Sequence, residues 1–347
     1  MSIRPSDSVV RIFIAAAVIA ALVAVLIVAV GGGEEGPGAP AERGTATASW
    51  GTLEPSPLTR TEVGAARIDG RIYVLGGYLP DGTTTGRMAV YDISDGEWEE
   101  GPTLPAAVNH PGVAALGGDL YALGGNLEAD AGQEPKSRRL FRYHPREEEW
   151  IELPSAPTAR AALGLVAIDD RLYAAGGTTE RSDRLRTLEI YDAGNQRWTA
   201  GAPMPTGRNH VGAAVLDGDM VVTGGRPGPE HGGLTTVERY DPDRDRWREM
   251  PPLGTARSGH ATVAAAGGLV AFGGEELDDG TTIAAVEFFD AAEGSWKRLP
   301  DMVTPRHGLG AAALGSRVFA IEGGPRPGLA FSGALEFLDV PPASGPS

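Results

Sequence analysis

The chain has 347 residues, with 50 Gly, 27 Pro and no Cys, and its formal net charge is −16. The absence of Cys excludes disulfides, thiol catalysis and thiolate metal sites, and the negative charge argues against nucleic-acid binding through a general basic surface. The many Gly and Pro residues favour short elements joined by turns.

The first predicted element is a membrane-spanning helix over residues 12–30. All 19 of these residues are apolar, and a helix of this length spans about 28 Å, close to the hydrocarbon thickness of a bilayer. Basic residues precede the segment and acidic residues follow it, at Arg4, Arg11, Glu34 and Glu35. Residues 1–11 are therefore expected in the cytoplasm and the remainder outside, as a single-pass membrane protein. A cleaved signal peptide is the alternative.

Residues 31–48 are rich in Gly, Pro and Ala, which predicts a flexible linker, and residues 341–347 are predicted to be a disordered tail. Between them, over 49–340, an apolar run ending in Gly-Gly recurs six times with a period of about 49 residues. The runs read RIYVLGG, DLYALGG, RLYAAGG, DMVVTGG, GLVAFGG and RVFAIEGG. Six recurrences at this period indicate a repeat architecture.

Each unit is predicted to contain four short strands, here named a to d. Strand a is rich in Gly and Ala, strand b ends at the Gly-Gly pair, strand c ends in Tyr-Asp or an equivalent, and strand d begins near a Trp. Two-residue turns such as Asp69-Gly70 suit the a–b hairpin. Four antiparallel strands in six units predict an all-β, six-bladed β-propeller.

The Gly-Gly pair, the Tyr-Asp end of strand c and the Trp six residues later resemble the kelch repeat. This resemblance covers roughly residues 50–340. Copper radical oxidases of similar fold use a linked Cys–Tyr pair, and the absence of Cys excludes that chemistry here. The segment DPDRDRW over 241–247 superficially resembles a calcium loop, but its sixth residue is not Gly, so it is predicted to be a c–d turn.

The sixth unit lacks its own strand d. A Trp-containing segment near the N-terminus is therefore predicted to supply that strand and close the ring, which would remove an exposed sheet edge. The six Trp residues, all assigned structural roles, are Trp50, Trp98, Trp150, Trp198, Trp247 and Trp296.

Arginines recur ahead of the Gly-Gly pairs, at Arg60, Arg160, Arg208, Arg257 and Arg306. Strand c of the last four units carries a Glu, at Glu189, Glu238, Glu287 and Glu336. The second unit lacks both, having Val108 and Phe141. This joint occurrence predicts a repeated internal Arg–Glu ion pair, and a ring of arginines that binds anions is the alternative. The first unit has Arg60 but carries Ala89 at the strand-c position, so Arg60 is predicted to lie outside this repeated pair. Glu62, two residues later, is an alternative partner for Arg60.

The b–c and d–a connections share one face of the predicted propeller, and the b–c loops vary in length and chemistry. Variable loops on a rigid scaffold commonly carry binding sites. The candidate binding residues on this face are Arg60, Glu62, Asn109, His110, Asn209, His210, His260, His307 and Glu322.

Glu322 is counted as an extra residue in strand b of the sixth unit, which predicts a β-bulge facing the same part of the mouth as Arg60. The four histidines do not align by repeat position, so no metal ligand and no cofactor are assigned. The leading hypothesis is an extracytoplasmic, membrane-tethered module that binds a protein or a glycan and no nucleic acid. The alternative is a mutarotase-like enzyme that uses residues such as Glu322 and Arg60 at the channel mouth.

Overall fold

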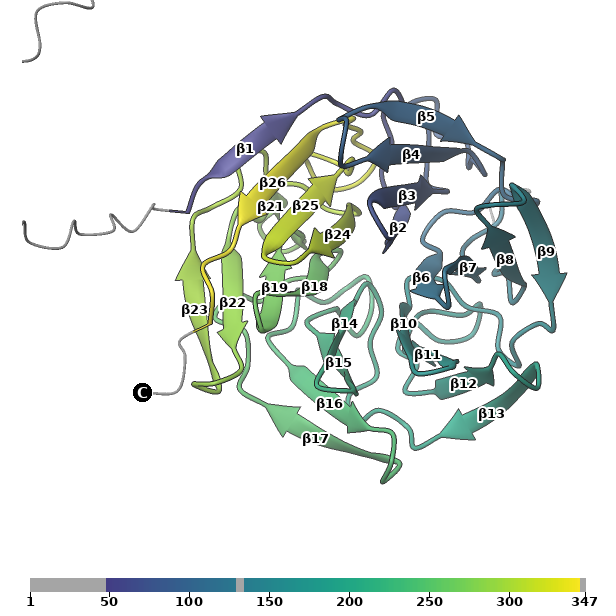
Figure 1. Cartoon of the computed structure of the whole chain (residues 1–347). Coiled ribbons are helices and arrows are strands. Elements are labelled where there is room, and N and C mark those ends of the chain that lie inside the picture. The colour runs from purple at the N-terminus through teal and green to yellow at the C-terminus, as the bar shows by residue number, and fades with distance from the viewer. Residues whose placement is uncertain (1–47, 129–133, 344–347) are drawn as a thin grey trace, which may run out of the picture. The chain divides into compact units, whose positions relative to one another are not determined.

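The computed structural model describes residues 48–128 and 134–343. These residues form six four-stranded antiparallel sheets arranged as blades around a central axis (Figure 1). The predicted all-β, six-bladed propeller is therefore confirmed. The predicted cytoplasmic segment 1–11, the membrane helix 12–30, nearly all of the linker and residues 344–347 lie outside the described residues. Among the described residues there is no helix with the length and hydropathy needed to span a membrane.

The strands follow the predicted a-b-c-d order within each blade. Blades 1 to 3 consist of β2 (Gly64–Ile68), β3 (Arg71–Leu75), β4 (Met88–Asp92) and β5 (Trp98–Gly101); β6 (Gly112–Leu116), β7 (Asp119–Leu123), β8 (Leu140–His144) and β9 (Glu149–Leu153); and β10 (Gly164–Ile168), β11 (Arg171–Ala175), β12 (Leu188–Asp192) and β13 (Arg197–Gly201).

Blades 4 to 6 are built in the same way. They consist of β14 (Gly212–Leu216), β15 (Asp219–Thr223), β16 (Val237–Asp241) and β17 (Arg246–Met250); β18 (Ala261–Ala265), β19 (Gly268–Phe272), β22 (Val286–Asp290) and β23 (Ser295–Leu299); and β24 (Gly310–Leu314), β25 (Arg317–Ile321), β26 (Leu335–Asp339) and β1 (Trp50–Leu53). A small hairpin of β20 (Glu275–Glu276) and β21 (Thr281–Thr282) lies in the b–c loop of blade 5.

The a strands lie nearest the axis, where the blades crowd together (Figure 1). A Cβ atom on Gly64 would lie 2.2 Å from Val113 Cγ2 of the next blade, and one on Gly310 would lie 2.9 Å from Ala65 Cβ. The Gly and Ala content of strand a thus follows from close approach of neighbouring sheets. Farther out, larger side chains fill the wedge between blades, as where Met88 of blade 1 packs in one cluster with Phe141 of blade 2.

The ring closes through β1, as predicted. This strand pairs antiparallel with β26, in a register that runs from Trp50 opposite Leu338 to Leu53 opposite Leu335. Figure 1 shows the N-terminal strand at the outer edge of the blade formed by the C-terminal end of the chain. Because β1 takes the place of strand d, the outer edge of β26 is paired.

The six Trp side chains connect neighbouring blades. Each indole Nε1 donates a hydrogen bond to a carbonyl just beyond the last strand of the preceding blade, at distances of 2.7–3.0 Å. Trp50 uses the carbonyl of Pro300, and Trp98 uses that of Glu54, which follows β1. The predicted structural role of the Trp residues is thus an interblade contact repeated around the ring.

Candidate functional site

The repeated arginines are buried inside the blades. Arg208 is typical: its Nη1 donates to the carbonyls of Gly224 and Thr236 at 2.8 and 2.7 Å, so it ties the end of strand b to the start of strand c. Each of the four predicted pairs has its nitrogen and oxygen 2.7–2.9 Å apart: Arg160–Glu189, Arg208–Glu238, Arg257–Glu287 and Arg306–Glu336. The interpretation as a repeated internal ion pair is confirmed in these four blades.

Burial lowers the pKa of Arg208 to about 10, with Glu238 acting in the opposite direction. The guanidinium stays charged near neutral pH at that value. These buried pairs therefore stabilise the charged form of each arginine where water does not reach it.

Arg60 is also fully buried, and as predicted it has no strand-c Glu partner, but it is paired with a carboxylate from another blade. Its Nε and Nη2 each donate to a carboxylate oxygen of Glu322 at 2.8 Å, and the remaining donor contacts match those of Arg208. Glu62, the proposed rival, contacts His110 instead. Blade 1 carries Ala89 where blades 3 to 6 have Glu, and Glu322 of blade 6 supplies the missing carboxylate from across the closure.

Glu322 is not an inserted residue in strand b, and the predicted bulge is wrong. Strand β25 has the same five-residue register as β3, with Ile321 opposite Gly310 as Leu75 is opposite Gly64. Glu322 therefore occupies the slot of the first glycine of the pair, and its φ of 55° lies in the left-handed region that glycine favours. The mutarotase alternative gave Glu322 and Arg60 as examples of residues acting at the mouth, but both side chains are buried and bound to each other.

Closer to the axis, the residue two positions after each arginine, or after Val108 in blade 2, lies in a left-handed conformation. These six residues form what we call the inner ring: Glu62, His110, Ala162, His210, Gly259 and Gly308, with φ between 52° and 60°. From His110 to Gly308, each backbone N–H donates to the carbonyl of the preceding member at 2.8–3.0 Å. Val63 N closes this ring of hydrogen bonds by donating to Gly308 O at 3.3 Å. This chain of hydrogen bonds holds the inner ring rigidly at the channel mouth.

The inner ring brings together three of the predicted site residues. Glu62 Oε2 lies 3.0 Å from His110 Nε2, and the rings of His110 and His210 have centroids 4.8 Å apart. The other three members, Ala162, Gly259 and Gly308, have no side chain beyond Cβ and leave a cavity of about 130 Å³ beside the cluster.

The two asparagines predicted for this face orient the two histidines. His110 Nδ1 lies 2.6 Å from Asn109 Oδ1, and His210 Nδ1 makes the equivalent contact with Asn209 Oδ1. An amide oxygen only accepts hydrogen bonds, so each Nδ1 carries the proton and donates it. In His210 this leaves Nε2 with a lone pair, which accepts a hydrogen bond from Arg226 Nη2 at 3.2 Å.

The charges around the cluster shift its ionisation. Burial acts to raise the pKa of the Glu62 carboxyl, but His110, His307 and His210 outweigh it and hold that pKa well below its usual range. Burial lowers the pKa of His210 well below its ordinary value, and Arg226 and His110 lower it further. At neutral pH the cluster therefore contains an ionised Glu62 and a neutral His210.

The other two predicted histidines have different surroundings. His307 Nε2 lies 3.4 Å from Glu62 Oε1 and 3.8 Å from Glu275 Oε2, so it borders the cluster. His260 is buried one step deeper, where its Nε2 is 2.8 Å from Thr223 Oγ1. His260 is thus not part of the group formed by Glu62, His110 and His210.

Sequence reasoning missed the residues in the slot that follows the Gly-Gly pair. This slot forms backbone bridges to the residue after each arginine, and in blades 4 and 5 it holds Arg226 and Glu275, which form an ion pair of 2.6 Å. In blade 1 it holds Tyr78, which donates a hydrogen bond to Glu134 and lies against His110. Aligning the first five units on their Gly-Gly pairs exposes this slot in the sequence.

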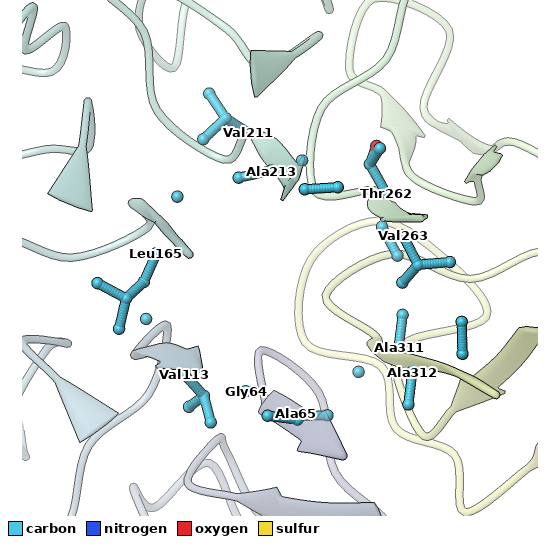
Figure 2. A pocket seen from close by; sticks show the side chains of 18 of the residues that line it. Gly64, Ala65, Val113, Leu165, Val211, Ala213, Thr262, Val263, Ala311 and Ala312 are labelled. Carbon is cyan, nitrogen blue, oxygen red and sulfur yellow. The ribbon is translucent and has the colours of Figure 1, made fainter. Parts of the chain in front are cut away.

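Below the inner ring the axis is lined by small, mainly apolar side chains. Figure 2 shows Ala65, Val113, Leu165, Ala213 and Val263 around this opening, which forms a channel of about 530 Å³. The inner ring precedes the a strands, so the polar cluster lies on the face of the b–c and d–a connections. The segment 241–247 lies on the opposite face as the predicted c–d turn, where Arg244 pairs with Asp241.

Comparison with known proteins gives two family matches along the chain. Residues 109–324 match the KLHDC2/KLHL20/DRC7 Kelch-repeats domain, and residues 59–105 match the Kelch motif. Similar curated proteins include Kelch-like protein terF of Aspergillus terreus, 33% identical over 50% of this chain and 41% of that protein. Human Kelch-like protein 34 is 29% identical over 44% of this chain and 25% of that protein. The chain thus spans less than half the length of these relatives.

Among solved structures, the one titled "Structure of YjhT" superposes with a TM-score of 0.70 at 15% identity, covering 82% of this chain and 95% of the other. At that identity the likeness extends to the fold alone. The sequence signatures, the six four-stranded blades and the family matches agree: this chain belongs to the kelch-repeat family of β-propellers.

Proposed function

We propose that this chain is a membrane-tethered, extracytoplasmic interaction module whose propeller binds a protein partner on the face of the b–c and d–a connections. The observation that carries the proposal is the polar cluster at the mouth on that face, built around Glu62, His110 and His210 on a rigid inner ring. Rigid support lowers the ordering cost of a binding site.

The b–c loops around the mouth support the choice of a macromolecular partner. They differ in sequence from blade to blade and carry exposed charges, such as Arg181 and Arg184 in blade 3 and Asp278 in blade 5. Variable, charged loops surrounding a fixed polar centre match the polar rim of many protein interfaces. The curated relatives bear kelch-like names and none of the names states a ligand.

Photo-crosslinking in cells tests the binding face. A photoreactive residue at position 184, in a b–c loop, is expected to capture a discrete partner, whereas one at position 146, in an exposed c–d turn, serves as the control on the opposite face. The purified partner is then titrated against a loop variant, Arg181→Ser with Arg184→Ser, and a turn variant, Asp95→Ser with Arg146→Ser. At least a tenfold weaker affinity only in the loop variant supports the proposal. Equal affinity, or capture only from position 146, contradicts it.

Membrane tethering has a separate test because it rests on residues 12–30 and the flanking charges. Protease added to intact cells is expected to release the propeller, and the remaining N-terminal part is expected to stay with the membrane. Protection of the propeller in intact cells but not in lysed cells would contradict the extracytoplasmic placement.

A further inference from the structure

Three potential metal ligands meet at the channel mouth. Glu62, His110 and His210 each offer one ligand atom, and these atoms lie within 4.8 Å of one another. They come from blades 1, 2 and 4, but they share the same inner-ring slot and the same left-handed backbone. Their positions are therefore set by one rigid, hydrogen-bonded circuit rather than by three independent loops.

We propose that Glu62, His110 and His210 form a binding site for a divalent transition-metal ion of the zinc class. Two imidazoles and one carboxylate are a donor set that suits such ions. Tetrahedral bonds of about 2.0–2.1 Å place ligand atoms about 3.3 Å apart. The 3.0 Å between Glu62 Oε2 and His110 Nε2 is close to that spacing, and His210, whose ligand atom lies within 4.8 Å of the other two, would move inward to complete the set.

The surroundings of both histidines match those of metal ligands. Metal-bound imidazoles usually donate their second N–H to a fixed acceptor, which sets the ring orientation and the tautomer. Asn109 and Asn209 provide that acceptor for the two Nδ1 atoms, and Asn126 Nδ2 donates to Asn109 Oδ1 at 2.7 Å and thereby fixes the amide. Nε2 is thus the ligating atom of each ring, and the ion would replace the proton between His110 and Glu62.

The inner ring also provides the necessary space. Ala162, Gly259 and Gly308 occupy the slots between and opposite the three ligands, and the cavity of about 130 Å³ is lined by all six members. With three protein ligands, the ion keeps a coordination position for water or for a donor atom of another molecule.

One neighbouring cation competes with the ion. Arg226 Nη2 donates to His210 Nε2 at 3.2 Å, so metal binding requires this contact to open. The 2.6 Å ion pair of Arg226 with Glu275 uses the other nitrogen, Nη1, so it does not depend on the contact with His210. His307, Glu275, Tyr78 and His260 are the remaining charged or titratable neighbours. His307 lies 3.4 Å from Glu62 Oε1, Tyr78 packs against His110, and His260 lines the same cavity.

Titration of the full-length, metal-stripped protein with Zn²⁺ alone tests the proposal. We expect one Zn²⁺ ion per chain, and Co²⁺ in its place should give visible absorption bands typical of low coordination number. His110→Ala and His210→Ala should each weaken Zn²⁺ affinity at least tenfold and abolish the Co²⁺ bands. Ala162 shows that the slot accepts alanine, and unchanged thermal unfolding of the metal-free variants verifies the fold.

Three further variants sharpen this test. Asn109→Ala should lower the affinity about tenfold, and Asn109→Asp, which keeps the acceptor oxygen, should restore it. Arg226→Met removes the competing donor and should raise the affinity. His144→Asn is the matched control, because His144 pairs with Asp119 at the end of β8, away from the inner ring. Absence of Zn²⁺ binding, or binding lost in His144→Asn but kept in His110→Ala, would overturn the proposal. None of these outcomes depends on the proposed protein partner.

Discussion

Glu322 adopts a backbone conformation for which the other five blades use glycine. The corresponding residues, Gly76, Gly124, Gly176, Gly224 and Gly273, have φ between 52° and 73°, and Glu322 has 55°. A non-glycine residue there costs on the order of 1 kcal/mol in backbone strain. The two hydrogen bonds that the Glu322 carboxylate accepts from buried Arg60 offset that cost, because an unpaired buried guanidinium is far more unfavourable.

Exchanging the carboxylate between blades tests this account. Glu322→Gly restores the common Gly-Gly pair but leaves Arg60 unpaired, and it should reduce the free energy of unfolding by about 3–5 kcal/mol. Adding Ala89→Glu places a carboxylate in the strand-c slot used by blades 3 to 6, because Ala89 lies opposite Val74 as Glu238 lies opposite Val222. The double variant should recover more than half of the loss in urea unfolding. No recovery would show that the two slots are not equivalent.

At the scale of elements, β1 gives blade 6 a fourth strand like that of the other five blades, although β1 lies at the other end of the chain. Its backbone pairs with β26, its Trp50 ring packs edge-on against Phe272 of blade 5 at 5.9 Å, and its Nε1 bonds to Pro300 O. One four-residue strand therefore contacts both its own blade and the preceding one. Without it, β26 would present an unpaired edge.

Truncation of the N-terminal side measures the contribution of this strand. A fragment of residues 48–347 should unfold cooperatively in urea, and a fragment of residues 54–347 should lose that transition or aggregate. Within the longer fragment, Trp50→Ala should cost about 2–4 kcal/mol, because it removes a partly buried ring and a hydrogen bond. Trp50→Phe keeps the ring contact and should cost about 1 kcal/mol. Equal stability of the two fragments would contradict closure through β1.

At the scale of the whole molecule, buried histidines link folding to pH. Burial lowers the pKa of His260 well below its ordinary value of 6.5, and Arg257 and Arg208 lower it further. His210 is shifted in the same direction. In the unfolded chain both histidines take up protons as the pH falls through about 6.5, whereas in the folded chain they do not. Stability is therefore unaffected by these groups above that pH and decreases below it.

The expected slope is up to about 1.4 kcal/mol per pH unit for each histidine below pH 6.5. Urea unfolding of the metal-free protein between pH 7.5 and 5.5 measures it, in a range where ordinary carboxyl groups stay ionised. His260→Asn should reduce this slope by the contribution of one histidine, which is up to about 1.4 kcal/mol per pH unit. His231→Asn, in an exposed loop, is the control. A slope unchanged by His260→Asn would rule out the assignment of this proton uptake to His260.

Much of the architecture was predictable because each blade is a local unit. The spacing of the Gly-Gly pairs, the Asp and the Trp depends only on turns and strand lengths within about 49 residues, and six copies reinforce one another. The four Arg–Glu pairs were predictable because their partners lie about 30 residues apart within one blade and occur together from unit to unit. Closure by Trp50 followed from counting, since six units require six fourth strands.

The sequence by itself therefore determined the blades, their number and the way the ring closes. Only the tertiary structure decided that Glu322 takes a glycine slot, that it binds Arg60 from the far end of the chain, and that Glu62, His110 and His210 converge. The physical reason is that contacts within a blade are set by local backbone geometry. Contacts between blades depend on how the closed ring brings distant segments to one axis, where hydrogen bonds between consecutive inner-ring residues set the final positions.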